Sequence, residues 1–263
     1  MFAIFIDDIV DTVRRTNVGC YVNFICCAIF LYADDIVLLA PSVTGLQFLL
    51  TTCERYLSEI DMNINVSKST CIRFGPRFSN VCEKLRLCNG DQLEWSVRCK
   101  YLGVHLVSST SFRVLFDIAK GRFFRSWNAI FSKVGRTASE EVVISLLRHK
   151  CLPILLYGTE SCPLFARDKH SFEFSVTKIF MKLFRTNSSP IVKECQKAFR
   201  FLPIANLIDI RTAAFLERYM ATDNVACDLF FIGAADHLRR LAGLYGLREA
   251  SSHLIKTKCY SDL

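Results

Sequence analysis

Hydrophobic and polar residues follow two different periods along this chain, and the pattern changes near residue 107. Before that point, helical spacing alternates with short apolar runs that are typical of strands. From Ser111 onward a spacing of about 3.6 residues continues and predicts about six helices. The fold class expected is therefore α+β, with a mixed unit over residues 1–106 and an all-helical unit over residues 107–263.

Two amphipathic helices are expected in the mixed unit. Met1–Arg15 has a helical spacing of apolar residues but no N-cap before it, so it resembles the second half of a longer element. Ser42 can cap a second helix that continues to about Ile60. The apolar faces comprise Phe2, Phe5, Ile6, Ile9 and Val13 in the first helix and Leu46, Leu49, Leu50, Cys53, Tyr56, Leu57 and Ile60 in the second.

The tetrad Tyr32-Ala33-Asp34-Asp35 lies between two apolar runs, Phe24–Leu31 and Ile36–Ala40. This arrangement predicts a buried hairpin with two adjacent carboxylates at its turn. Burying charge is unfavourable unless a partner compensates for the lost hydration, and the usual partner of paired aspartates is a divalent cation. Paired carboxylates also bind Mg²⁺ in phosphoryl transfer, so Asp34 and Asp35 are candidate metal ligands of a nucleotidyl-transfer site.

Further strands are expected later in the mixed unit. Thr70–Phe74 and Tyr101–Val107 have strand-like composition. Asn89-Gly90 separates two short apolar segments, residues 85–87 and 93–95, and predicts a hairpin with a type I′ turn.

The helix expected from Ser111 to Arg136 has two distinct faces. Its apolar stripe contains Phe116, Phe123, Phe124, Trp127, Ile130, Phe131 and Val134. Basic residues cluster on the opposite side, and a basic ridge of this kind can follow a phosphate backbone. The candidate nucleic-acid-binding residues are Arg122, Arg125, Lys133 and Arg136, and a merely solvated polar face is an equal alternative.

The positive charge of the chain is concentrated in its second half. Residues 1–106 hold 10 Lys and Arg against 11 Asp and Glu, a net charge of −1. Residues 107–263 hold 23 against 14, a net charge of +9, which together gives the +8 of the whole chain. A basic half beside a carboxylate site suggests a polyanionic partner, and a solvated basic surface is again the alternative.

Composition indicates an intracellular protein that does not cross a membrane. The thirteen cysteines show no CxxC pair or regular spacing, which fits reduced thiols better than a disulfide framework. A span over Val18–Ala40 would place Asp34 and Asp35 in hydrocarbon at about 2.5–3.5 kcal/mol each. The apolar N-terminus lacks the basic region of a signal peptide.

Several segments in order resemble the reverse transcriptases of non-LTR (LINE-type) retrotransposons. Leu31–Asp35 is similar to the catalytic hairpin of that family, and Ile64–Ser69 to the Asn- and Lys-containing motif that follows. Tyr101–Val104 is similar to the primer-grip strand, and Leu152–Gly158 to a stretch of the helical thumb. Phe2–Val10 resembles the helix after the template-positioning motif.

The resemblance implies a polymerase palm followed by a thumb, acting on an RNA template and a DNA primer with Mg²⁺. It implies that Asp34 is the carboxylate shared by both metal ions, with Asp35 beside it. It also implies that Lys68 lies near the leaving pyrophosphate, where its ammonium stabilises charge or donates a proton, and that Tyr32 packs beneath the site. The primer end would be held by Tyr101, Leu102 and Gly103.

The chain departs from the family in lacking the fingers, the template-positioning loop and the strand with a further metal-binding aspartate. Two-metal catalysis needs oxygen ligands from both strands. We therefore expect an N-terminally truncated domain that binds Mg²⁺ weakly and is inactive alone. The hairpin at residues 24–40 would keep an exposed sheet edge, which invites a partner strand.

Three interpretations remain open at this point. The chain is a reverse transcriptase whose missing part is supplied separately, a non-catalytic remnant that binds nucleic acid, or an interaction domain that recruits a protein through its sheet edge. No other acid is a good substitute for the missing metal-binding aspartate, since the candidate Asp228 lies in a helical stretch. Zinc is not expected, because Cys227, His237, His253 and Cys259 lack the close cysteine pair of a zinc knuckle.

Overall fold

The computed structural model describes residues 2–135 and 137–263, with side chains from residue 6 onward, and it divides into two compact units. The first unit contains the chain up to Cys99 together with Leu106–Phe112. The second contains Lys100–His105 together with Arg113–Leu263. The sequence boundary between residues 106 and 107 stays a prediction, and the structure shows that a short segment before it, residues 100–105, groups with the helices.

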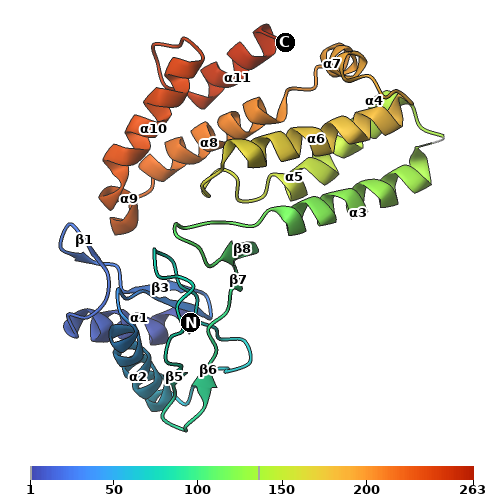
Figure 1. The fold of residues 1–263 in the computed structure, drawn as a ribbon. Helices are drawn as coiled ribbons and strands as arrows, with labels where there is room; N and C mark the ends of the chain where they lie inside the picture. Colours follow the sequence, from blue (N-terminus) through green and yellow to red (C-terminus); the bar gives the residue numbers. More distant parts are fainter. Residues whose placement is uncertain (1, 136) are drawn as a thin grey trace. The chain divides into compact units, whose positions relative to one another are not determined.

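The first unit combines two helices with short antiparallel hairpins, as Figure 1 shows. Its helices are α1 (Phe2–Arg15) and α2 (Val43–Glu59). Its strands pair two by two: β1 (Tyr21–Val22) with β2 (Ile25–Cys26), β3 (Ile29–Tyr32) with β4 (Asp35–Leu38), and β5 (Leu85–Arg86) with β6 (Gln92–Leu93). The strands β7 (Arg98–Tyr101) and β8 (Val104–Val107) form a fourth hairpin.

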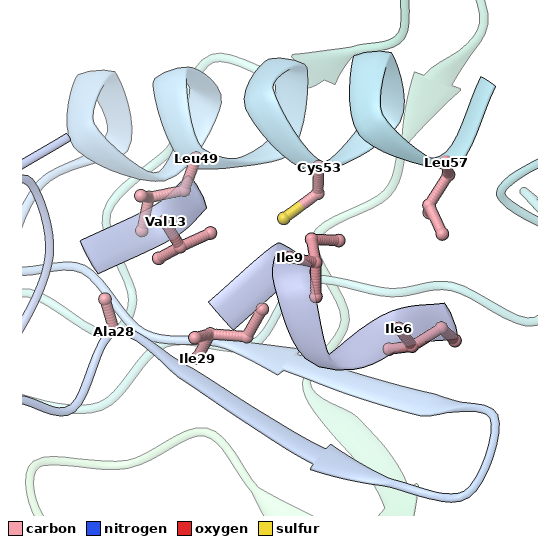
Figure 2. Close-up of a cluster of buried hydrophobic side chains, with 8 residues drawn as sticks. All are labelled: Ile6, Ile9, Val13, Ala28, Ile29, Leu49, Cys53 and Leu57. Atoms are coloured by element: carbon pink, nitrogen blue, oxygen red, sulfur yellow. The ribbon is translucent and has the colours of Figure 1, made fainter. Parts of the chain in front are cut away.

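One apolar core joins α1, α2 and the β3–β4 hairpin. Figure 2 shows the side chains of α1 pointing toward those of α2, with Ala28 and Ile29 beside them. The buried members are Ile6, Ile9, Val13, Ala28, Ile29, Leu49, Cys53 and Leu57. The amphipathic spacing of both helices is therefore confirmed, and the exposed Asp7 and Asp8 lie on the solvated face of α1.

The opposite side of α2 covers a second core. Leu50 packs there with Cys71, Leu85, Leu87 and Leu93. Polar contacts fix the hairpin β5–β6 to the helix: the Gln47 amide donates to the carbonyl of Arg86 and accepts from its N–H, both at 2.8 Å. The predicted N-cap is confirmed, since the Ser42 hydroxyl accepts from the Gly45 N–H at 3.0 Å.

Three strand predictions were wrong in extent. Tyr101–Val107 is not one strand, because the turn at Leu102-Gly103 separates β7 from β8. Phe24 does not belong to the strand that leads to the tetrad; it lies fully exposed, with φ 64°, in the turn between β1 and β2. Thr70–Phe74 forms no strand. Cys71 bridges Trp95 and Phe74 bridges Ser109, and because the two bridges involve different partners no ladder develops.

The hairpin around Asn89-Gly90 is confirmed, but its turn type was wrong. The connection is a three-residue loop that Leu87 and Asp91 close. The Leu87 N–H donates to the Asp91 carbonyl at 2.8 Å, and the Leu87 carbonyl accepts from the Gly90 N–H at 2.9 Å. Only Gly90 has a positive φ, of 90°, whereas a type I′ turn needs two such residues. The Asn89 side chain accepts from the Asp91 N–H at 2.9 Å and so stabilises the longer loop.

The second unit is helical apart from residues 100–105. Its elements are α3 (Asp117–Val134), α4 (Glu140–Leu146), a π-helical segment (Leu147–Cys151), α5 (Leu152–Leu155), α6 (Ala166–Leu183), α7 (Ser189–Ala198), α8 (Ile204–Met220), α9 (Val225–Leu229), α10 (Phe231–Leu244) and α11 (Ser252–Ser261). The described part thus contains more helical segments than the six expected, because several of the segments consist of only one or two turns.

The first helix of this unit begins later than predicted. Residues 111–116 are not helical, and the Leu115 N–H donates to the carbonyl of His105 at 2.7 Å. Phe116 is buried against Phe172, with ring centroids 5.2 Å apart. Leu115, which does not belong to the apolar stripe predicted for this helix, lies before its first residue.

Two cores hold the helical unit together. Trp127, Phe123, Phe172, Phe180 and Phe201 are its largest fully buried side chains. Farther along, α8 packs against α10 and α11, as the orange and red helices of Figure 1 show. Leu216, Leu238 and Ile255 are buried in that second core. The α+β fold class is confirmed, and among the described residues no helix is long and apolar enough to cross a membrane.

Candidate active site and nucleic-acid interface

The two candidate carboxylates lie at the tip of the β3–β4 hairpin. The register pairs Tyr32 with Asp35, so Ala33 and Asp34 form a two-residue connection. Ala33 has a φ of 51°, in the left-handed region that an alanine rarely adopts. The tight connection brings the two acidic residues next to each other at the end of the hairpin.

The hairpin tip is solvated, and the prediction of a buried turn was wrong. Asp34 and Asp35 are both exposed, and neither forms an ion pair with any described residue. Tyr32 is 62% exposed rather than packed beneath the site, because it shares a face of the hairpin with Asp35 and the core lies on the other face. Desolvation therefore does not by itself require a cation here.

The donor atoms at this tip fit Mg²⁺ in kind. Adjacent carboxylate oxygens are hard ligands, and Mg²⁺ commonly binds through one or two carboxylates while keeping several waters. The number of ligands does not fit a pair of ions. Within the described residues no group of three or more His, Cys, Asp and Glu side chains is placed to hold a metal.

Lys68 lies in a turn that Asn65 organises. The Asn65 side chain accepts hydrogen bonds from the Ser67 hydroxyl at 2.7 Å and from the Lys68 N–H at 3.2 Å. Its carbonyl also accepts from the Ser69 N–H at 2.9 Å. These bonds, in which the Asn65 side chain accepts from the N–H three positions on, explain why an asparagine precedes the lysine by three residues. The Lys68 side chain is exposed, and no described ion pair joins it to Asp34 or Asp35.

The predicted primer-grip residues form the tip of the β7–β8 hairpin. Leu102 and Gly103 have φ values of 45° and 83°, so the connection has the two positive φ angles of a type I′ turn. Tyr157 lies against this tip. Its hydroxyl donates to the carbonyl of Leu102 at 2.9 Å, and its ring leaves no free space above Gly103, where an added Cβ would lie 3.0 Å from Cε1.

Three of the four basic residues predicted on the long helix are confirmed as exposed. Arg122, Arg125 and Lys133 project from α3, while Arg136 lies outside the described residues. Their contact with nucleic acid remains a prediction.

Arg122 is electrostatically linked to the β7–β8 tip through His105. Burial lowers the pKa of His105 below its usual value of 6.5, and the positive charges of Arg122 and Lys100 lower it further. Its Nε2 is buried and has no hydrogen-bond partner among the described residues. The structure thus brings one predicted nucleic-acid-binding residue close to the predicted primer grip, within the same unit.

The candidate residues therefore form two groups. Asp34, Asp35 and Lys68 belong to the first unit, and residues 100–105 belong to the second together with Arg122. Sequence reasoning missed Tyr157, Lys100 and His105. Tyr157 was visible only as part of the Leu152–Gly158 motif, and its hydrogen-bond partner lies 55 positions away in the chain.

Comparison with known proteins addresses the first of these groups directly. Residues 1–106 match the family model described as Reverse transcriptase (RNA-dependent DNA polymerase). This reverse transcriptase-like segment contains Asp34, Asp35 and Lys68 and ends at Leu106, just after the Leu102-Gly103 turn. The basic residues of α3 lie beyond it.

The reverse transcriptase-like segment is the extent of the similarity found. No curated protein and no solved structure matches the chain. At the level of the family, the match supports a reverse transcriptase-like function and, with it, binding of a template and a primer.

Proposed function

We propose that this chain is the reverse transcriptase-like part of a non-LTR (LINE-type) retrotransposon protein, and that Asp34 and Asp35 are its Mg²⁺ ligands. The family match over residues 1–106 carries the proposal. The two-residue tip supports it, because it places two exposed carboxylates side by side without competing ion pairs among the described residues.

The chain's own residues have distinct roles in this proposal. Asp34 and Asp35 supply oxygen ligands, and bound Mg²⁺ would stabilise the negative charge that develops during phosphoryl transfer. The Asn65 turn presents the Lys68 ammonium to solvent, where it is available to stabilise the leaving pyrophosphate. The Leu102-Gly103 turn is proposed to hold the primer end, and the RNA template and DNA primer are the partners.

We further propose that this chain does not incorporate nucleotides by itself. Two-metal catalysis needs ions about 3.5–4 Å apart, held by several oxygen ligands. The hairpin tip contributes two adjacent carboxylates, and a further carboxylate strand has to come from outside the described residues. The proposed inactivity of the chain alone agrees with the expectation from the sequence.

A primer-extension assay tests both parts of the proposal. The purified chain is incubated with Mg²⁺, deoxynucleoside triphosphates and an RNA template annealed to a DNA primer, and no extension is expected. Addition of a reverse-transcriptase fragment that carries the fingers and the other carboxylate strand should restore extension. The D34N/D35N variant should abolish the restored activity, whereas restoration with this variant would exclude the assigned ligands. Extension by the chain alone would contradict the proposed inactivity.

A non-catalytic nucleic-acid-binding remnant is the second candidate function. The net charge of +9 over residues 107–263 favours it, together with the exposed Arg122, Arg125 and Lys133. Binding of an RNA–DNA duplex should weaken linearly with the logarithm of salt concentration, because phosphate contacts release counterions. A shallow salt dependence would instead favour the third candidate, a protein-interaction remnant.

The proposed setting is intracellular. All thirteen cysteines are described, and all are free thiols. Free thiols persist in a reducing compartment, which supports the proposal without identifying the compartment.

A further inference from the structure

A basic hollow lies in the helical unit, away from the residues assigned so far. It has a volume of about 450 Å³ and is bordered by α11 and by the turn that follows α7. Every lining residue has a polar side chain, and none is acidic. They are Arg200, His253, Lys256, Thr257, Tyr260 and Ser261.

The positions of these residues follow from helical spacing. His253, Lys256 and Tyr260 are three and four positions apart on α11 and therefore share one face. Ser261 extends the same face. Lys258 and Asp262, at the end of the same helix, neutralise each other, since the Lys258 ammonium lies 2.7 Å from the Asp262 carboxylate.

The cations of the hollow are not neutralised in this way. Arg200 and Lys256 are exposed, and neither forms an ion pair with a described residue. Two uncompensated positive charges beside the Tyr260 hydroxyl form a donor set suited to an anion with several oxygens.

Arg200 is held in place through both its backbone and its side chain. The Arg148 guanidinium donates to the carbonyls of Phe199 and Arg200, each at 3.0 Å. The Arg200 guanidinium lies over the Tyr260 ring at 5.9 Å from its centroid. Its φ of 49° is in the left-handed region, where glycine is the usual residue after a helix. The chain thus has an arginine at a position where its backbone is strained.

From this arrangement we infer that the hollow binds a phosphate group of a nucleic-acid backbone. Arginine and lysine would neutralise the phosphodiester, and the Tyr260 hydroxyl would donate to its oxygens. The Thr257 and Ser261 hydroxyls already donate to the carbonyls of His253 at 3.0 Å and of Lys258 at 2.8 Å, so they border the hollow without supplying donors. The volume accommodates a phosphate with its sugar. The inference rests on the proposed nucleic-acid binding of this chain, and adds a site that the basic ridge of α3 does not include.

The chemistry of the lining favours a nucleic acid over a lipid surface. Membrane-binding basic patches carry large apolar side chains that enter the bilayer beside the charges. The hollow has none apart from the Tyr260 ring, which already contacts Arg200. Phosphate contacts without an apolar component are typical of backbone recognition in nucleic acids.

The test compares two charge-matched double variants of the full 263-residue chain. R200A/K256A removes two positive charges from the hollow, and K193A/R248A removes two exposed positive charges elsewhere in the same unit. Fluorescence anisotropy with a labelled RNA–DNA duplex gives the dissociation constant over a range of salt concentrations. Circular dichroism establishes that each variant is folded.

The hollow variant should reduce the slope of log affinity against log salt by about 1 for each lost phosphate contact. The matched variant should leave the slope near the wild-type value, and R200K/K256R should restore binding because it keeps both charges. Equal effects of R200A/K256A and K193A/R248A would overturn the inference while leaving nucleic-acid binding intact.

Two further outcomes separate the sources of the phosphate. If wild-type chain binds no duplex, both this inference and the proposed nucleic-acid binding fail. If anionic phosphatidylserine vesicles bind in a manner that needs Arg200 and Lys256, while duplex binding does not, the site recognises lipid headgroups and the inference is wrong. Inorganic phosphate serves as a competitor, and it should displace the duplex only at high concentration because it makes one contact among several.

Discussion

The hydroxyl of Tyr157 donates a hydrogen bond to the carbonyl of Leu102 at 2.9 Å, and this contact secures a strained turn. Leu102 has a φ of 45°, a conformation that costs a residue with a side chain about 1–2 kcal/mol. The aromatic ring also covers Gly103, where an added Cβ would lie 3.0 Å from the ring, closer than an ordinary van der Waals contact. The predicted primer grip is thus shaped by a residue from the helical unit to which it belongs.

Substitution of Gly103 by alanine should destabilise the helical unit more than a left-handed backbone alone explains. The φ of 83° should cost about 1–2 kcal/mol, and the new Cβ adds a contact 3.0 Å from the Tyr157 ring. Urea unfolding monitored by circular dichroism measures the change in the free energy of unfolding.

Gly246 provides the matched control for this prediction. It has a φ of 66° in the same unit, and nothing lies within 4 Å of an added Cβ. G246A should therefore show only the backbone strain, of about 1 kcal/mol. In a Y157A background the excess effect of G103A should vanish; an unchanged excess would exclude Tyr157 as its cause.

The elements that sequence reasoning located best are those stabilised by local patterns. α1 and α2 follow from their apolar spacing. The cap of α2 follows from Ser42, because its hydroxyl accepts from an N–H only three positions along the chain. The acidic tip was located for the same reason, since a two-residue connection between paired strands is set by adjacent residues.

Features that depend on distant residues could not be predicted in this way. The missing strand at residues 70–74 reflects bridges to residues far along the chain, such as Phe74 with Ser109. The late start of α3 reflects the hydrogen bond of Leu115 to His105, ten positions earlier. The exposure of Asp34 and Asp35 depends on which face of the hairpin meets α1 and α2. The short runs beside the tetrad have apolar residues on both faces of the hairpin, so their pattern does not show which face is buried and which is solvated.

Removal of the Arg122 charge should raise the pKa of His105. Burial, the main cause of its lowered pKa, would persist, but the repulsion from Arg122 would be lost in R122Q. NMR titration of the histidine ring signals measures the change. R125Q is the control, because Arg125 is not among the charges that act on His105. An unchanged His105 pKa in R122Q would contradict the proximity of α3 and the β7–β8 tip.

The lowered pKa of His105 also predicts how stability depends on pH. Below the usual value of 6.5 the unfolded chain binds a proton at this residue more readily than the folded chain does. This contribution to the free energy of unfolding is therefore present above 6.5 and is lost as pH falls through the lowered pKa. R122Q should lose less stability than the wild-type chain on acidification, as measured by urea unfolding at several pH values.

Metal binding at the hairpin tip should be weak and should depend on both carboxylates. Two exposed aspartates without further protein ligands resemble the weakest oxygen sites in proteins, so a dissociation constant of about 1 mM or weaker is expected. Paramagnetic broadening by Mn²⁺ should affect NMR signals of residues 32–36, and D34N/D35N should abolish it. Broadening at another acidic cluster, such as Asp7 and Asp8 of α1, would show that the ion does not select the tip.

Self-association should proceed through the β3–β4 hairpin. This hairpin is a two-stranded sheet among the described residues, so both outer edges have free backbone groups, and Phe30 on its solvated face is 40% exposed. Burying a phenylalanine contributes about 1.5–3 kcal/mol, so F30K should weaken association about tenfold or more.

Phe48 on α2 is 51% exposed but lies on a helix, where no backbone edge is available. F48K should therefore change association less, as measured by sedimentation over a range of concentrations. A wild-type chain that stays monomeric at all concentrations would exclude the edge as a pairing surface, and equal effects of F30K and F48K would indicate a general dependence on exposed apolar area.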